Sequence, residues 1–200
     1  MKSRILALFT ALTVTLGSLS TVSAAQAAGS DDSRPAADVA TDRPNFQIFK
    51  DVADQVNRYA RFTVFDDVAA NIDNGVVTLT GHVTMPYKRD DLEKRVAKVT
   101  GVAQVQNKIA VLPVSMFDDE LRFRIARAIY GNSAFWHYAA MANPPIHIIV
   151  QNGHVTLTGV VNSNVERALA RSLATGFGEF DVKNDLKTDA EMQKVLEQIN

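Results

Sequence analysis

A ten-residue motif that occurs twice constrains the fold of this 200-residue chain more than any other feature. Residues 72–81 read IDNGVVTLTG, and residues 150–159 read VQNGHVTLTG. A second pair of segments, GVAQVQNKI at 101–109 and GEFDVKNDL at 178–186, follows in the same register apart from a one-residue slip. Two matching pairs in nearly one register indicate that the chain contains two copies of one module.

Each copy predicts the same succession of secondary-structure elements. A helix comes first, because apolar residues recur at helical spacing in both copies: Phe49, Val52, Val56 and Tyr59, then Phe117, Leu121, Ile125 and Ile129. A hairpin follows, since Asn-Gly tolerates the positive φ angles of a type I′ turn. A second helix and a third strand complete each copy, and the helical connection implies that strands two and three are parallel.

The Asn-Gly turns also predict the register of each hairpin. Two-residue loops at 74–75 and 152–153 place Val150 opposite Val155 and Ile148 opposite Leu157. One face of each hairpin is then apolar and the other is polar. Gly81 and Gly159 end the repeated motif and are expected to be turn residues at the ends of strands.

These patterns predict an α+β fold with two tandem αββαβ modules, each a three-stranded mixed sheet with two helices on one face. The predicted modules cover residues 45–114 and 115–187. An amphipathic helix is predicted over residues 188–200, where Thr188 and Glu191 form a capping box. That helix is too short to be stable alone, so we expect it to dock through one apolar stripe: Met192, Val195, Leu196 and Ile199.

The amino terminus has the pattern of a secretory signal peptide over residues 1–27. Lys2 and Arg4 precede an apolar run from Ile5 to about Leu19, and small residues lead to a predicted cleavage site after Ala27. The run is shorter than the roughly 20 residues of a transmembrane helix. Residues 28–44 contain almost no large apolar side chain and predict a flexible linker. The expected location is periplasmic.

Composition narrows the possible functions. Without Lys2 and Arg4, 19 basic residues stand against 22 acidic ones, and this acidic balance disfavours nonspecific nucleic-acid binding. The absence of cysteine excludes disulfides, cysteine-bound zinc and thiol nucleophiles. The histidines are predicted to be ordinary surface residues, and helix-start and turn positions explain the acidic pairs at 66–67 and 118–119. We therefore predict no catalytic residue, no metal site and no cofactor; the four histidines are His82, His137, His147 and His154.

Two features suggest binding. The second helix of the first module concentrates basic residues, which favours contact with anionic lipid, although a solvated helix face explains them as well: Lys88, Arg89, Lys94, Arg95 and Lys98. The second module carries an aromatic insertion at 132–145 that includes Trp136 and Tyr138. Such residues either lie at a membrane interface or pack between the modules.

The repeated segments resemble the BON (bacterial OsmY and nodulation) domain family over about residues 45–113 and 115–187. The resemblance rests on the Asn-Gly hairpin, the charged second helix, the glycine before strand three and the endings VQNKI at 105–109 and VKNDL at 182–186. It implies non-catalytic periplasmic modules that bind phospholipid or envelope partners and support the envelope under osmotic stress. The sequence leaves lipid and protein ligands open. The alternatives are an adaptor for another periplasmic protein and, from another class, a hydrolase with a site between the modules.

Overall fold

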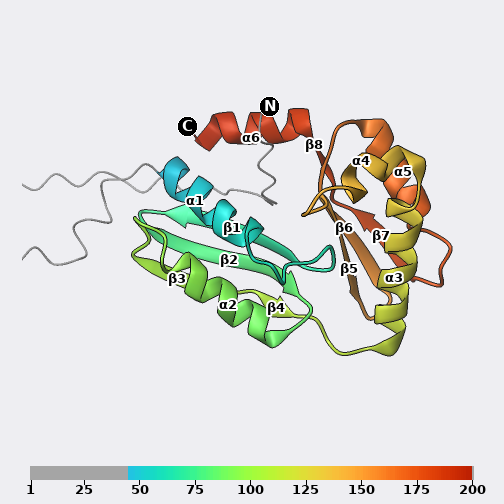
Figure 1. Ribbon diagram of the computed structural model, residues 1–200, viewed down its shortest axis with the longest axis horizontal. Helices are drawn as coiled ribbons and strands as arrows, with labels where there is room; N and C mark the ends of the chain where they lie inside the picture. Colours follow the sequence, from blue (N-terminus) through green and yellow to red (C-terminus); the bar gives the residue numbers. More distant parts are fainter. Residues whose placement is uncertain (1–44, 200) are drawn as a thin grey trace, which may run out of the picture.

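The computed structural model describes residues 45–199 and forms two modules followed by one helix (Figure 1). The first module contains α1 (Asn45–Asn57), β1 (Asp67–Asp73), β2 (Val76–Val83), α2 (Pro86–Val96), β3 (Gln104–Asn107) and β4 (Ala110–Val111). The second contains α3 (Met116–Tyr130), a 3-10 turn η1 (Ser133–Phe135), α4 (Trp136–Ala139), β5 (Ile146–Gln151), β6 (His154–Val161), α5 (Asn164–Leu173), β7 (Asp181–Asn184) and β8 (Lys187–Thr188). Helix α6 (Asp189–Ile199) follows. The predicted signal peptide and linker lie outside the described residues.

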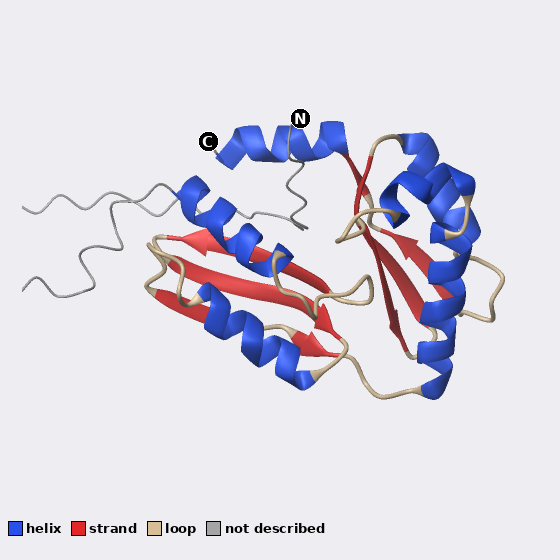
Figure 2. Cartoon of the chain, viewed as in Figure 1, coloured by secondary structure: helices blue, strands red, loops and turns tan. Residues whose placement is uncertain are grey.

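The two modules share the predicted topology. In each, an antiparallel hairpin is extended by a parallel third strand, and the strand orders are β1-β2-β3 and β5-β6-β7. Helices α1 and α2 cover one face of the first sheet, and α3 and α5 cover one face of the second (Figure 2). The α+β fold with tandem αββαβ modules is confirmed.

The third strand of each module is broken by the asparagine of the repeated ending. Strands β4 and β8 continue the parallel pairing to β2 and β6 after this break. The Asn107 amide nitrogen donates to the Arg89 carbonyl at 3.0 Å, and its oxygen accepts from the Ile109 N–H at 3.2 Å. Asn184 makes the equivalent bonds to Arg167 and Leu186. The repeated asparagine therefore ties the strand to the second helix of its own module.

The hairpin register agrees residue by residue with the prediction. Ile148 pairs with Leu157, Val150 pairs with Val155, and the equivalent pairs hold in the first module. The apolar faces form two cores that include Ile48, Val52, Val77, Leu79 and Leu92 in the first module, and Leu121, Ile125, Ile129, Ile148 and Leu157 in the second. Phe117, predicted in the α3 stripe, is instead 51% exposed.

Two of the repeated glycines lie inside strands, so their predicted role as turn residues is wrong. Gly81 and Gly159 have φ angles of 112° and 118° and pair with Val68 and Ile146 on the neighbouring strands. A Cβ atom on Gly159 would lie 1.8 Å from the Pro145 carbonyl oxygen. The close approach of the two backbones therefore requires glycine at these positions.

This close approach predicts that Gly159→Ala destabilises the protein more than Gly176→Ala. Gly176 has a comparable φ of 96°, but a Cβ atom there would meet no atom within 4 Å. Gly176→Ala should therefore cost about 1 kcal/mol of backbone strain. Gly159→Ala should cost about 1 kcal/mol more, because a strand must also shift. Urea unfolding checks this, and equal losses for the two variants would contradict it.

The loop between α1 and β1 joins the two modules. The Ile148 N–H on β5 donates to the Val64 carbonyl at 2.7 Å. Phe65 packs against the second core, and its ring lies 5.1 Å from that of Phe123 in an edge-on contact. The helix-free face of the second sheet is turned toward the first module (Figure 2). Part of the predicted polar face of the second module is therefore covered.

Helix α6 begins with the predicted capping box. The Thr188 N–H donates to the Glu191 carboxylate at 2.8 Å, and the Glu191 N–H donates to the Thr188 hydroxyl at 3.3 Å. Arg167 on α5 pairs with Glu191 at 3.0 Å, and Met192 is buried. These contacts attach the start of the helix to the second module. The side chains of Leu196 and Ile199 lie outside the described ones.

Candidate functional site

Lys88 does not belong to a binding surface. Its side chain is buried, and its ammonium nitrogen lies 2.6 Å from the carboxylate of the fully buried Asp66. Asp66 also accepts hydrogen bonds from the backbone N–H groups of Thr63 and Thr84, both at 2.8 Å. The predicted ligand-binding role of Lys88 is replaced by a structural one, because this ion pair fastens α2 to the loop before β1.

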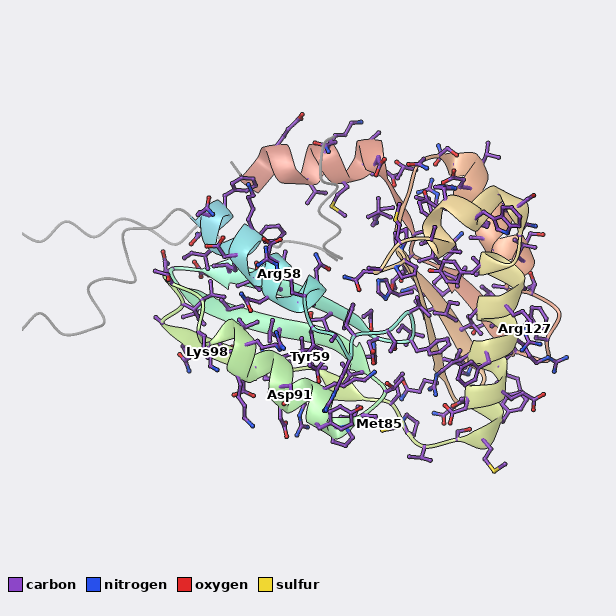
Figure 3. The ribbon with its side chains drawn as sticks, in the orientation of Figure 1. Arg58, Tyr59, Met85, Asp91, Lys98 and Arg127 are labelled. Carbon is purple, nitrogen blue, oxygen red and sulfur yellow. The ribbon has the colours of Figure 1, made fainter. Side chains whose placement is uncertain are left out.

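The remaining basic residues in α2 and in the turn after it divide into packed and exposed side chains. The Arg95 guanidinium lies over the Tyr59 ring at 5.0 Å, and the Tyr59 hydroxyl donates to Asp91 at 2.7 Å (Figure 3). Burial and Asp91 raise the pKa of Tyr59 to about 12. Arg89 pairs with Asp90 on the surface. Lys94 and Lys98 are exposed, so they are the basic groups most accessible to a partner.

The aromatic insertion contains one exposed ring and one buried ring. Trp136 is 69% exposed, whereas Tyr138 is 3% exposed within the second core. The Tyr138 hydroxyl donates to Glu166 at 2.7 Å and accepts from the Asn162 N–H at 2.9 Å. Burial and Glu166 raise the pKa of Tyr138. The predicted binding role is therefore removed for Tyr138 and stays a proposal for Trp136.

An exposed apolar cluster at one end of the second module was not predicted. We call this cluster the apolar end. Its side chains are all more than half exposed: Val114 (97%), Met116 (91%), Phe117 (51%) and Phe180 (76%). A Cβ atom on Gly153 would lie 2.9 Å from the Phe180 ring and 3.5 Å from the Phe117 ring, so both rings flank the hairpin turn. The signal in the sequence was Phe180, which stands where the first copy has Ala103.

The acidic pairs have structural partners. Asp118 is fully buried, and its two carboxylate oxygens accept from the backbone N–H groups of Asn152 and Gly153, each at 2.8 Å. This contact holds the hairpin turn against the start of α3, where the Ser115 hydroxyl accepts from the Asp118 N–H. The carboxylates of Asp66 and Asp118 are thus both engaged in holding the fold.

His147 is buried, which contradicts its predicted surface position. It lies on the polar face of β5 and is 4% exposed, because the loop of the first module covers it. Its ring lies 5.4 Å from that of Phe62. Burial lowers the pKa of His147, although Asp67 and Asp66 act in the opposite direction. We therefore expect His147→Ala to destabilise the contact between the modules.

The lowered pKa of His147 predicts a loss of stability in acid. The unfolded chain takes up a proton on this imidazole below about pH 6.5, while the folded protein resists protonation until the pH reaches the lower folded pKa. The contribution of His147 to stability should therefore be fully present above about pH 6.5 and be lost as the pH falls from that value through the lower folded pKa. The raised pKa of His82, caused mainly by its hydrogen bond to Asp67, acts with the opposite sign. Its contribution is present in acid and is lost as pH rises through the folded value.

Thermal unfolding of a His147→Gln variant between about pH 7.5 and pH 5 separates these contributions. The variant should lose less stability on acidification than the unchanged chain, because it lacks the buried imidazole. His137→Gln is the matched control, since His137 is exposed. An unchanged pH profile in His147→Gln would show that another group governs the acid response.

A cleft of about 620 Å³ lies between the modules. Its lining includes Asp67 and His82 from the first sheet. The Asp67 carboxylate lies 3.1 Å from the His82 ring nitrogen Nδ1. His154 lines the cleft from the second sheet and pairs with Asp181 at 2.8 Å. Within residues 45–199 no hydrogen bond joins either imidazole to a hydroxyl nucleophile. The same residues contain no group of three or more metal-ligating side chains suited to a metal ion.

Two tandem αββαβ modules define this chain as a repeat α+β protein. The BON domain model matches residues 46–113 and 118–190, so the chain belongs to the BON domain family and carries two copies of the domain. Modules of this family are generally non-catalytic, and proteins that contain them are often periplasmic or envelope-associated. In the described part of the chain, no helix combines the length and apolarity that a membrane span requires.

One similar structure is CdsD, a structural protein of the type III secretion system of Chlamydia trachomatis. The match has 14% identity, covers 76% of this chain and 97% of the other, and has a TM-score of 0.27. A similarity at this level carries no argument about function. No curated protein matches the chain significantly.

Proposed function

We propose that this chain is an exported, non-catalytic binding protein that associates with anionic phospholipid surfaces of the cell envelope and supports envelope integrity under osmotic stress. The observation that carries the proposal is the apolar end, where large apolar side chains cluster in contact with water. Clusters of this kind mark surfaces that dock against a membrane or a protein. Family membership supports an envelope location.

The apolar end has the chemistry of a shallow membrane anchor. Met116 and Phe180 are 91% and 76% exposed, and Phe117 lies beside Phe180 across the hairpin turn. The N-terminal end of α3 and the β5–β6 turn lie at the same end of the module in Figure 1, so these side chains can reach one surface together. Apolar and aromatic side chains contribute to interfacial binding by leaving water.

Exposed basic residues add an electrostatic contribution. Lys94 projects from α2 and Lys98 from the turn that follows it, and each contributes roughly 1 kcal/mol when it lies near an anionic membrane. The chain as a whole has a formal net charge of −1, so a local basic face would be needed to approach such a surface. This contribution should weaken as salt rises.

Vesicle flotation of residues 28–200 tests the proposal. We expect binding to vesicles rich in phosphatidylglycerol and weaker binding to phosphatidylcholine vesicles. The double change Phe117→Ser and Phe180→Ser should reduce binding about tenfold or more, since each ring loses its apolar contact. Val165→Ser is the matched control, because Val165 is 75% exposed on α5, away from the apolar end.

Charge reversal and fluorescence locate the contact further. The double change Lys94→Glu and Lys98→Glu should weaken binding to anionic vesicles only. It leaves Arg95 unchanged, so the packing of Arg95 on Tyr59 is kept. Trp136 is the only tryptophan, so a blue shift on adding vesicles would place α4 at the interface. Absence of any vesicle binding, together with specific capture of an envelope protein, would instead support the adaptor function.

A further inference from the structure

The cleft between the modules is distinct from the proposed membrane surface. Its walls are the polar faces of the two sheets, with Thr80 and His82 on β2 and with Gln151, Thr156 and Thr158 on the β5–β6 hairpin. Neither the apolar end nor α2 contributes to these walls. Its volume of about 620 Å³ falls within the range of small-molecule sites.

The charged groups of the cleft are already paired. Asp67 pairs with His82 at 3.1 Å, Lys183 pairs with Asp185 at 2.7 Å, and His154 pairs with Asp181 at 2.8 Å. An ionic ligand would have to compete with these pairs for its partner. The electrostatics of the cleft therefore favour a neutral ligand.

Thr158 supplies a buried polar group without a partner. The residue lines the cleft and is only 6% exposed, and its hydroxyl has no hydrogen-bond partner among the described residues. Buried hydroxyl groups are normally paired, so an unpaired one in the wall of a cleft points to a ligand that completes it. The hydroxyl is closed to water in this structure, so the wall beside it would have to open for a ligand to reach it. Thr156 and Gln151 lie on the same face of the hairpin and can both donate and accept hydrogen bonds.

We propose that this cleft binds a neutral, polyhydroxylated molecule, such as a short saccharide. Hydroxyl groups of the ligand both donate and accept, as do the threonine and amide side chains of the walls. Ile149 and Ala69 add apolar surface for the C–H groups of a sugar ring. Because residues from both modules line the cleft, the ligand would contact both and stabilise their arrangement.

Amide NMR spectra of residues 28–200 test the proposal, with maltotriose, chitotriose and trehalose as neutral probes. Inorganic phosphate and spermidine are the charged probes. At least one neutral probe should shift the amide signals of Thr80, Gln151 and Thr156 in a saturable way, and the charged probes should not. No saturable shift from any neutral probe would overturn the proposal, as would a response of the same amides to phosphate or spermidine.

Two valine variants provide the second readout. Thr158→Val should weaken saccharide binding about tenfold, because it removes one buried hydrogen bond. Its melting temperature should be unchanged or higher, since an unpaired hydroxyl is replaced by a methyl group of similar shape. Thr78→Val is the matched control: Thr78 holds the place of Thr156 in the first module but does not line the cleft. Unchanged saccharide binding in Thr158→Val would overturn the assignment of Thr158 to the site. Vesicle flotation tests the proposed membrane binding separately, so either proposal can fail without the other.

Discussion

Leu157→Ala is expected to lower the free energy of unfolding by about 2–5 kcal/mol. Leu157 is fully buried on β6, opposite Ile148 on β5 and beside Asn184 on β7. Truncation removes apolar contacts on the helix-covered face and leaves a cavity that the surrounding β-sheet fills only partly. Urea unfolding followed by circular dichroism measures the loss.

A matched pair of variants tests how the modules unfold. Leu79 is fully buried at the position of the first module that corresponds to Leu157. Because Val64 and Phe65 of the first module contact the second, we expect Leu79→Ala and Leu157→Ala to shift one common transition. Val165→Ala should change stability by less than about 0.5 kcal/mol. A comparably small effect of Leu157→Ala would contradict its buried position.

Asp66→Ala is expected to destabilise the protein by about 3–5 kcal/mol. The change leaves the buried Lys88 ammonium without its carboxylate, and it leaves the backbone N–H groups of Thr63 and Thr84 without their acceptor. An unpaired charge that stays out of water is far more unfavourable than a broken surface pair. Chemical unfolding at neutral pH measures this loss.

Two further variants isolate the buried ion pair. Asp90→Ala breaks the exposed pair with Arg89 on the same helix and should cost at most about 1 kcal/mol. Adding Lys88→Met to Asp66→Ala should recover part of the lost stability, because it removes the uncompensated charge. If Asp66→Ala cost no more than Asp90→Ala, the structural role of this pair would be refuted.

The topology of each module followed from local patterns. Asn-Gly turns and alternating apolar residues predicted the hairpin register down to the Ile148 and Leu157 pair, because a slip of one residue would move every apolar side chain to the wrong face. The capping box at Thr188 was predicted for a similar reason, since its partners are three residues apart. Interactions between near neighbours are readable from spacing.

The roles of individual side chains were less predictable. Lys88 read as one member of a basic helix face, yet its partner Asp66 lies 22 residues earlier in the chain. Phe117 fitted the helical stripe of α3, but it lies at the end of the module where the core stops and the side chain meets water. Periodicity shows which way a side chain points, and it does not show how far the covering layer extends.

The repeat and its spacing were thus sufficient for the number of modules, their topology and their register, since these depend on turns, caps and alternation within short segments. The arrangement of the modules depends on contacts such as Val64 with Ile148 and Phe62 with His147, which join residues more than 80 positions apart. Only that arrangement buries His147 and creates the cleft beside Thr158. A polar strand face has the same alternating pattern whether water or another module covers it.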